Sequence, residues 1–85
     1  MRWRLMVARL VVEYLVSLRY AGHELRESIR GMAQEAEPWV SDRVIPGRPG
    51  AQRVRYERLM RDHWIGYEVL HHEHTIRVIY VQPAP

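Results

Sequence analysis

Arginines gather in one block of the chain, and their spacing suits the binding of phosphate. Residues 1–42 carry six arginines and six acids, whereas residues 43–61 carry six arginines and only one acid, Glu57. The formal net charge of +3 therefore lies in the second half. A guanidinium fork donates two hydrogen bonds to one phosphate, and a one-sided basic block is typical of proteins that bind a polyanion or an acidic protein. The alternative is a solvated edge that discourages strand aggregation. The block consists of Arg43, Arg48, Arg53, Arg55, Arg58 and Arg61.

Four consecutive polar residues, His71, His72, Glu73 and His74, raise the question of a metal site. His72 and His74 could converge on an ion with His63 or Glu73. The run falls, however, where the last hairpin of the chain must turn, and polar residues are expected at a loop tip. We therefore predict no metal site and no cofactor.

The composition excludes several other kinds of chemistry. With 85 residues, the chain is expected to form one small domain over residues 1–85 with a modest core. It has no cysteine, which excludes disulfides, thiolate zinc sites and cysteine nucleophiles. All 13 basic residues are arginine, which excludes a phosphate-loop lysine and Schiff-base chemistry. No segment is typical of a secretory signal or of a bilayer span, so we expect a cytosolic protein without membrane contact.

Three segments in the second half alternate in the way expected of strands that bury one face. They cover residues 53–57, 64–69 and 76–81, and the short connections between them predict an antiparallel meander. The alternation places the arginines of the first strand on the face away from the core. It also turns three tyrosines toward the core: Tyr56, Tyr67 and Tyr80.

The first half of the chain predicts a second layer. Residues 1–7 alternate as a short opening strand, and apolar residues recur at helical spacing over 7–18 and 25–33. The β-branched residues of the first helix leave a long strand as the alternative. Gly22 stands where the two helices must separate, and Pro38 ends the second helix. The predicted fold class is therefore α+β, with an antiparallel sheet of a short N-terminal strand and a three-strand C-terminal meander packed on a helical hairpin, in the order β-α-α-β-β-β.

The first helix carries more apolar surface than one core face needs. Val12 and Val16 lie on the far side of this helix from Leu10, Tyr14 and Leu18. Such a stripe is often covered by a partner chain, although the helix could also be clamped between the sheet and the second helix. We predict that Val12 and Val16 bind a partner, and a homodimer is one form that this contact could take.

The order of these elements resembles the RelE/ParE superfamily of toxins from bacterial type II toxin–antitoxin systems. The resemblance runs over essentially the whole chain. It is best in the helical hairpin that ends near Pro38, in the loop 47–50 that leads into Arg53 and Arg55, and in the last two strands. Residues 62–69 are similar to the family's D-Y-R-V-x-Y-x-V strand, and residues 75–81 are similar to its final strand.

The resemblance implies a function on RNA. Family members of the RelE type are ribosome-dependent endoribonucleases, in which a ribose 2′-hydroxyl attacks the adjacent phosphate. Basic residues on the strand after the loop serve this reaction, and Arg53 and Arg55 occupy the matching places. His63, beside Asp62, is the best titratable candidate for proton transfer, and its alternative is an ordinary loop histidine. Further RNA contacts are expected from four residues: Arg48, Arg58, Arg61 and Trp64, the last by stacking on a base.

The chain also departs from the family pattern. The family's arginine within D-Y-R falls at Trp64, and the arginine after the last strand falls near Ala84. Two other functions therefore stay open, a ParE-like toxin that binds DNA gyrase without nuclease activity and a diverged, non-toxic binding module. The partners that the resemblance implies are a cognate antitoxin and either the ribosome with its mRNA or DNA gyrase.

Overall fold

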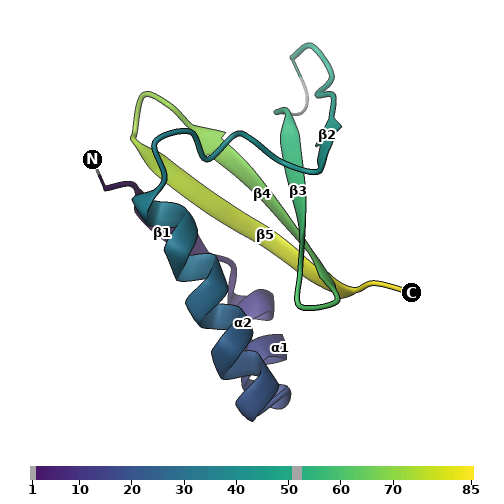
Figure 1. Cartoon of the computed structure of the whole chain (residues 1–85). Coiled ribbons are helices and arrows are strands. Elements are labelled where there is room, and N and C mark those ends of the chain that lie inside the picture. The colour runs from purple at the N-terminus through teal and green to yellow at the C-terminus, as the bar shows by residue number, and fades with distance from the viewer. Residues whose placement is uncertain (1, 51–52) are drawn as a thin grey trace.

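A five-stranded sheet forms the centre of the computed structural model, which describes residues 2–50 and 53–85. The strands lie in the order β1-β5-β4-β3-β2 (Figure 1). The pairs β2–β3, β3–β4 and β4–β5 are antiparallel, and β1 pairs in parallel with β5. Their bounds are β1 Arg4–Val7, β2 Arg43–Ile45, β3 Arg55–Met60, β4 His63–Leu70 and β5 Thr75–Pro83.

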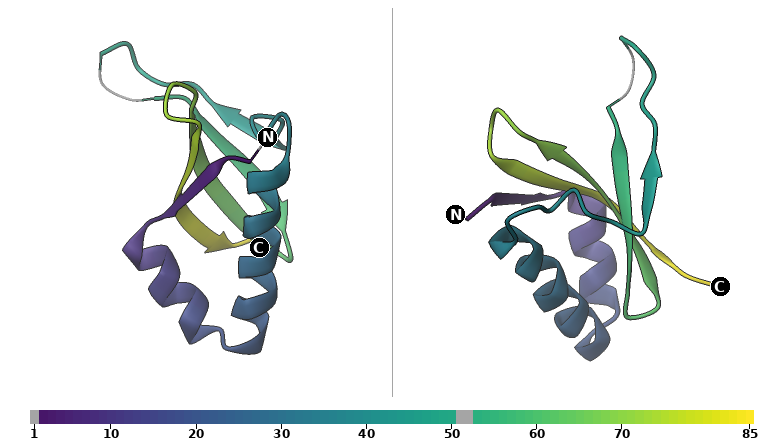
Figure 2. Two further views of the ribbon diagram at one scale, coloured as in Figure 1. Left: turned by 90° about the vertical axis from the view of Figure 1, so that its left-hand side faces the viewer. Right: turned by 45° about the horizontal axis from the view of Figure 1, so that its top comes forward.

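Two helices cover one face of this sheet. Helix α1 spans Arg9–Ser17 and α2 spans Tyr20–Gly31, followed by the short 3-10 helix η1 at Met32–Gln34. Figure 2 shows both helices on the same side of the sheet. None of the helices in residues 2–50 and 53–85 is long and apolar enough to cross a membrane.

The core lies between the helices and the sheet. Val11 and Leu15 of α1 and Leu25 and Ile29 of α2 are buried one helical turn apart, so each helix turns one apolar stripe inward. The sheet contributes alternate residues of its two longest strands, as the period of a strand requires. These residues are Ile65, Tyr67, Ile76 and Val78, and Trp3 closes the core beside β1.

The fold class predicted from the sequence is confirmed, with four differences in detail. The sheet has an additional edge strand, β2, and β1 makes a parallel pair in an otherwise antiparallel sheet. The helices separate at Leu18 and Arg19, where Arg19 has a φ of 56°, and not at Gly22. Leu10, expected to share the inner face of α1, is 77% exposed.

Gly22 lies inside α2 and allows the two helices to touch. A Cβ atom at this position would lie 1.8 Å from the carbonyl oxygen of Leu15, so only glycine fits there. The residue therefore serves the contact between the helices and not the break between them. The break falls at the residue with positive φ three positions earlier.

A β-bulge reverses the direction of one tyrosine. Gly66 pairs with Tyr80 and Tyr67 pairs with Val78, so Ile79 is an extra residue in β5. A bulge of this kind re-aims the side chains that follow it. Tyr56 and Tyr67 do point toward the helices, but Tyr80 points to the opposite face, so the prediction for Tyr80 was wrong. We call this opposite side the helix-free face; it carries Arg43, Arg55, Glu57, Trp64, Gly66, Glu68, Arg77 and Tyr80.

Candidate functional site

The arginines of the basic block do not share one surface. Side chains alternate along β3, so Arg55 lies on the helix-free face and Arg58 lies on the side of the helices. Arg61 lies in the turn between β3 and β4 and also faces α2. The block predicted from the sequence is therefore divided between a face that the helices cover and a face that they leave open.

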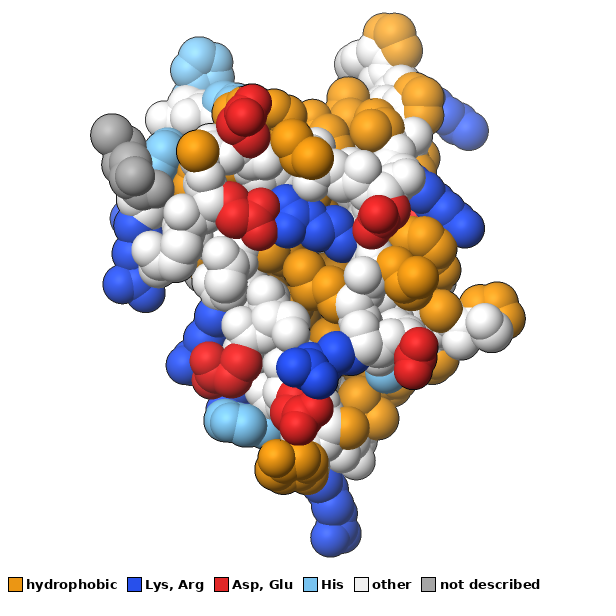
Figure 3. All heavy atoms as spheres, viewed as in Figure 1, with side chains coloured by type: hydrophobic (Ala, Val, Ile, Leu, Met, Phe, Trp, Pro, Cys, Tyr) orange, Lys and Arg blue, Asp and Glu red, His pale blue; other side chains and the backbone are white. Residues whose placement is uncertain are grey.

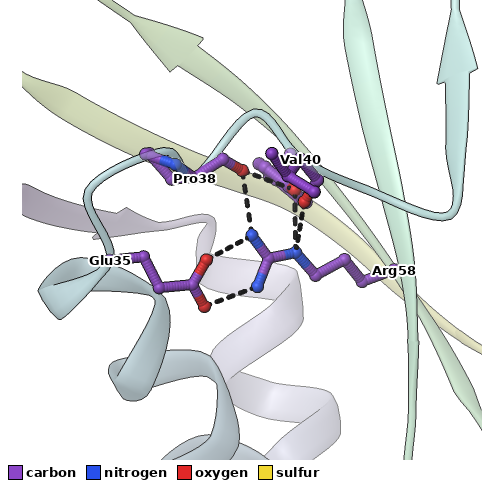
Figure 4. A network of polar contacts seen from close by, with 5 residues as sticks. Glu35, Pro38, Val40 and Arg58 are labelled. Carbon is purple, nitrogen blue, oxygen red and sulfur yellow. Dashed lines mark hydrogen bonds and ion pairs between the residues drawn. The ribbon is translucent and has the colours of Figure 1, made fainter.

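Arg58 is bound within the protein. Its guanidinium forms a two-pronged pair with Glu35, with both Nη–Oε distances at 2.6 Å, and also donates to the carbonyl oxygens of Pro38 and Val40 (Figure 4). The Arg58 side chain is only 14% exposed. The hydrogen bond with Glu35 is the largest of the effects that raise the pKa of Arg58. This arginine holds the segment after η1 against the sheet, where Tyr67 also donates to Pro38.

Arg61 and His63 likewise contact the helices. Arg61 donates to Glu24 Oε2 at 2.8 Å and to Ser28 Oγ at 3.2 Å, both in α2. The two ring nitrogens of His63 lie 2.9 Å from the Arg61 carbonyl oxygen and 2.9 Å from the Tyr14 hydroxyl. A carbonyl can only accept, so Nδ1 carries a proton and donates to the Arg61 carbonyl, and the second ring nitrogen, Nε2, shares a hydrogen bond with the Tyr14 hydroxyl. His63 therefore lies on the opposite side of the sheet from Arg55.

Charges of both signs are interspersed on the helix side. Figure 3 shows acidic and basic side chains close together on the surface seen in Figure 1, with apolar side chains between them. The ion pairs of Arg58 and Arg61 with glutamates agree with this pattern. Because the arginines on the helix side are paired with glutamates, this side offers little net positive charge to a polyanion.

Four directly paired residues form a row across the helix-free face. Arg43 of β2 pairs with Glu57 of β3, Glu57 with Gly66 of β4, and Gly66 with Tyr80 of β5. A Cβ atom at Gly66 would lie 2.1 Å from Tyr80 Cζ, so the tyrosine ring lies directly over the glycine. The ring thereby crosses β4, and its hydroxyl donates to Glu57 Oε2. Arg43 Nη1 lies 3.7 Å from the other oxygen, Oε1.

This environment changes the acidity of Tyr80. Burial, followed by the hydrogen bond to Glu57, raises the pKa of Tyr80 to about 12. Arg55 and Arg43 act in the opposite direction and lower this pKa. The hydroxyl therefore stays protonated near neutral pH and serves Glu57 as a donor.

The remaining residues of the face provide an aromatic surface and a second ion pair. The Arg43 guanidinium lies 3.8 Å from the centre of the Trp64 ring, within the range of a cation–π contact. Trp64 shares its face with Gly66 and Glu68, as predicted. Arg77 donates to Glu68 Oε1, which neutralises one positive charge of the face.

Arg48 and Arg53 lie in the connection between β2 and β3. Both are exposed, and Arg53 precedes β3 by two residues instead of lying within it. Arg55 is the first residue of that strand and is half-buried. The structure thus leaves Arg55 and Trp64 on the helix-free face and Arg48 and Arg53 exposed in the connection before β3, and it separates Arg58, Arg61 and His63 from that face.

Three residues of this face were not among the site residues predicted from the sequence: Arg43, Glu57 and Tyr80. Glu57 did carry a signal, because it is the single acid of the basic block and alternates with Arg55 onto the same face. Arg43 lies in a strand of only three residues, too short for its alternation to be read. For Tyr80, alternation indicates the wrong face because of the bulge.

The histidine run forms the turn between β4 and β5, as expected. His74 stacks on Trp3 with ring centres 3.9 Å apart, and His71 contacts Trp3 and Trp39 by its edge or at a tilt. Within residues 2–50 and 53–85, no group of three or more potential ligands is arranged to hold a metal ion. These histidines pack against tryptophans at the end of the core.

A groove of about 770 Å³ lies between the two helices and β1. Val12 and Val16 line it together with the apolar residues Leu5, Val7, Leu15 and Ile29. Val12 is 44% exposed and Val16 is 67% exposed. Basic residues also line the groove: Arg2, Arg4, Arg19, Arg26, Arg30 and His23.

Comparison with known proteins supports the fold. No family model matches the chain, and neither does any curated protein sequence. Two solved structures match 98% of it. One is a mutant of the Escherichia coli toxin RelE in the free state, with a TM-score of 0.70, 16% identity and 84% of that chain covered. The other is the archaeal RelE–RelB complex from Pyrococcus horikoshii, with a TM-score of 0.69, 23% identity and 96% of that chain covered. The chain therefore has the fold of RelE.

Proposed function

We propose that this protein is the toxin of a type II toxin–antitoxin system and that it inhibits translation by ribosome-dependent cleavage of mRNA. The observation that carries the proposal is the helix-free face of a sheet with the RelE fold. On this face Arg43 and Arg55 lie with an aromatic ring, Trp64, and with the Glu57–Tyr80 pair. Cations, a stacking surface and a proton-accepting group are the parts that cleavage of single-stranded RNA needs.

In this proposal the arginines at the start of β3 bind the RNA backbone. Arg55 lies on the open face, and Arg53 and Arg48 are exposed in the connection that precedes it. Their forks suit the non-bridging oxygens of a phosphate, and their charge stabilises the negative charge that develops during attack. Trp64 stacks on a base next to the reacting phosphate.

A gyrase-binding toxin of the ParE kind is the second candidate. Two features favour it. The position at which the family carries an arginine holds Trp64 here, and Arg77 on the same face is paired with Glu68. Under this alternative the helix-free face is a protein-binding surface, and replacement of Arg53 and Arg55 leaves its effect on gyrase largely intact.

We further propose that the groove between the helices binds the cognate antitoxin. The solved relative from Pyrococcus horikoshii is a RelE–RelB complex. In this chain the groove combines exposed valines with a rim of arginines, so its complement is an apolar segment with acidic flanks. This role agrees with the partner contact that the sequence predicts for Val12 and Val16.

Induced expression in a bacterial host tests the proposed function. Growth is followed together with the integrity of translated messages, mapped by primer extension. Growth arrest with new cleavage sites in translated messages is the expected result. Arrest with intact messages would favour gyrase as the target, and normal growth would indicate a binding module without toxicity.

A further inference from the structure

The row of Arg43, Glu57, Gly66 and Tyr80 is built by three separate features of the chain. The bulge at Ile79 turns Tyr80 to the helix-free face. Gly66 leaves the space in which the tyrosine ring crosses β4. Glu57, the single acid of the basic block, then receives the tyrosine hydroxyl. A carboxylate with 11% of its side chain exposed is thus held in one orientation among arginines.

We propose that Glu57 is the general base of this site and that Tyr80 is the positioning residue that orients its carboxylate. The proposal rests on the proposed cleavage of RNA and names the group that takes the proton. Arginine is a poor base because it keeps its proton, and His63 lies on the other side of the sheet. Glu57 is the carboxylate that lies beside both Arg43 and Tyr80 on the open face.

The two oxygens of Glu57 have different surroundings. Oε2 accepts the hydrogen bond from Tyr80. Oε1 lies 3.7 Å from Arg43 Nη1, which is too long for a hydrogen bond, so Oε1 keeps a lone pair for an incoming proton. Arg43 reaches the carboxylate from β2, Arg55 lies on the same strand as Glu57, and Tyr80 comes from β5. These three groups are the titratable and charged neighbours of the Glu57 carboxylate.

The substrate class is a single-stranded RNA phosphodiester with a free 2′-hydroxyl. Glu57 Oε1 takes the proton of the 2′-hydroxyl as the 2′-oxygen bonds to phosphorus. The bond between phosphorus and the 5′-oxygen breaks, and the departing oxygen takes a proton from water. Protonated Glu57 then returns its proton to solvent, so the products are a 2′,3′-cyclic phosphate and a 5′-hydroxyl end. Arg43 and Arg55 face the phosphate while its charge develops.

The test is the single-turnover rate of cleavage of a defined mRNA in a reconstituted translation system, measured against pH. Glu57→Gln keeps the shape of the side chain and an acceptor for Tyr80. It is expected to lower the rate by about 100-fold or more, as loss of a general base does, and to abolish the fall of the rate on the acidic side. Binding of the protein to the programmed ribosome is expected to stay within about threefold of the wild type.

Two further variants separate a catalytic role from a structural one. Tyr80→Phe keeps the base but releases Oε2. It is expected to lower the single-turnover rate by about tenfold while ribosome binding stays within about threefold of the wild type, because a carboxylate without its donor no longer holds one orientation toward the 2′-hydroxyl. Glu68→Gln removes a carboxylate of the same face that is paired with Arg77, and should leave both the rate and its pH profile unchanged. Circular dichroism confirms that each variant is folded.

The outcomes distinguish this inference from the function on which it rests. If the wild type cleaves the message and Glu57→Gln cleaves it with the same rate and pH profile, Glu57 is not the general base. The nuclease proposal would still stand. An equal loss of cleavage rate in Glu57→Gln and Glu68→Gln would also overturn this role of Glu57, because removal of either negative charge from this face would then explain the loss without a general base. Absence of cleavage by the folded wild type would refute both proposals.

Discussion

The contact between Glu35 and Arg58 is expected to stabilise the protein in an asymmetric way. Arg58 is the buried member, with 14% of its side chain exposed, whereas Glu35 is 39% exposed. Glu35→Ala leaves the Arg58 guanidinium largely shielded from solvent, with only carbonyl and hydroxyl groups as hydrogen-bond partners. Arg58→Met leaves a carboxylate that water can reach, and Tyr67 still satisfies the Pro38 carbonyl. Removing the glutamate should therefore cost more than removing the arginine.

The magnitude follows from the degree of burial. Removing one partner of a fully buried pair costs about 3–5 kcal/mol. Because Glu35 is partly hydrated, we expect Glu35→Ala to lower the free energy of unfolding by about 2–4 kcal/mol, after discounting for solvent screening. For Arg58→Met we expect about 1–2 kcal/mol, since an apolar side chain of similar length fills the same space. Each kcal/mol corresponds to about 4–8 °C in the melting temperature of a domain of this size.

Urea unfolding followed by tryptophan fluorescence measures these values, and Trp39 reports on the segment that Arg58 holds. Glu13→Ala is the matched control, because it removes a glutamate from an exposed pair with Arg9. Its expected cost is below about 1 kcal/mol. A Glu35→Ala protein as stable as this control, or an Arg58→Met protein that is the less stable of the two, would refute the reasoning.

Three further predictions concern the helices, Tyr80 and the groove. Gly22→Ala brings a Cβ atom to 1.8 Å from the Leu15 carbonyl oxygen and should lower the free energy of unfolding, measured by thermal unfolding, by about 3 kcal/mol or more. Gly31→Ala, with open space around it, should be neutral or stabilising by up to about 1 kcal/mol. Equal effects of the two substitutions would contradict the contact between the helices at Gly22. The raised pKa of Tyr80, about 12 when folded, means that its contribution to stability is complete below about pH 10 and is lost as pH rises from about 10 to 12. Tyr80→Phe should reduce this alkaline loss in urea unfolding, and an unchanged pH dependence would count against the Glu57 contact. Val16→Asp, at an exposed position of the groove, should weaken co-purification with the proposed antitoxin without lowering the melting temperature. Leu10→Asp, on an exposed residue outside the groove lining, should leave co-purification intact.

Most of the secondary structure could be predicted from local patterns in the sequence. Each element buries one face, and the periods of helix and strand are short enough to be read within a few residues. Strands β3, β4 and β5 and the helical hairpin were predicted on this basis, and the resemblance to RelE predicted their arrangement. The short strand β2 could not be predicted, since its three residues are all exposed and carry no alternation of burial. The bulge at Ile79 was also invisible, because one extra residue in β5 leaves a sequence that still alternates.

The candidate site was predicted only in part, for a physical reason. Local charge indicates that a basic surface exists, but the partner of each arginine is set by residues distant in the chain. Arg58 and Glu35 are 23 positions apart, and Arg61 and Glu24 are 37 positions apart. The strand period itself separates Arg58 from Arg55, so grouping them on one RNA-binding surface went against the alternation. Arg55 and Trp64 do lie on the helix-free face, and their contact with RNA stays a prediction.

The most direct test of the central claim compares purified wild-type protein with an Arg53→Ala/Arg55→Ala variant. Cleavage of a translated mRNA on the ribosome and inhibition of gyrase supercoiling are measured side by side. Our account predicts that the wild type cleaves the message, that the folded variant does not, and that neither protein inhibits gyrase. Inhibition of gyrase by both proteins, with the message left intact, would contradict it.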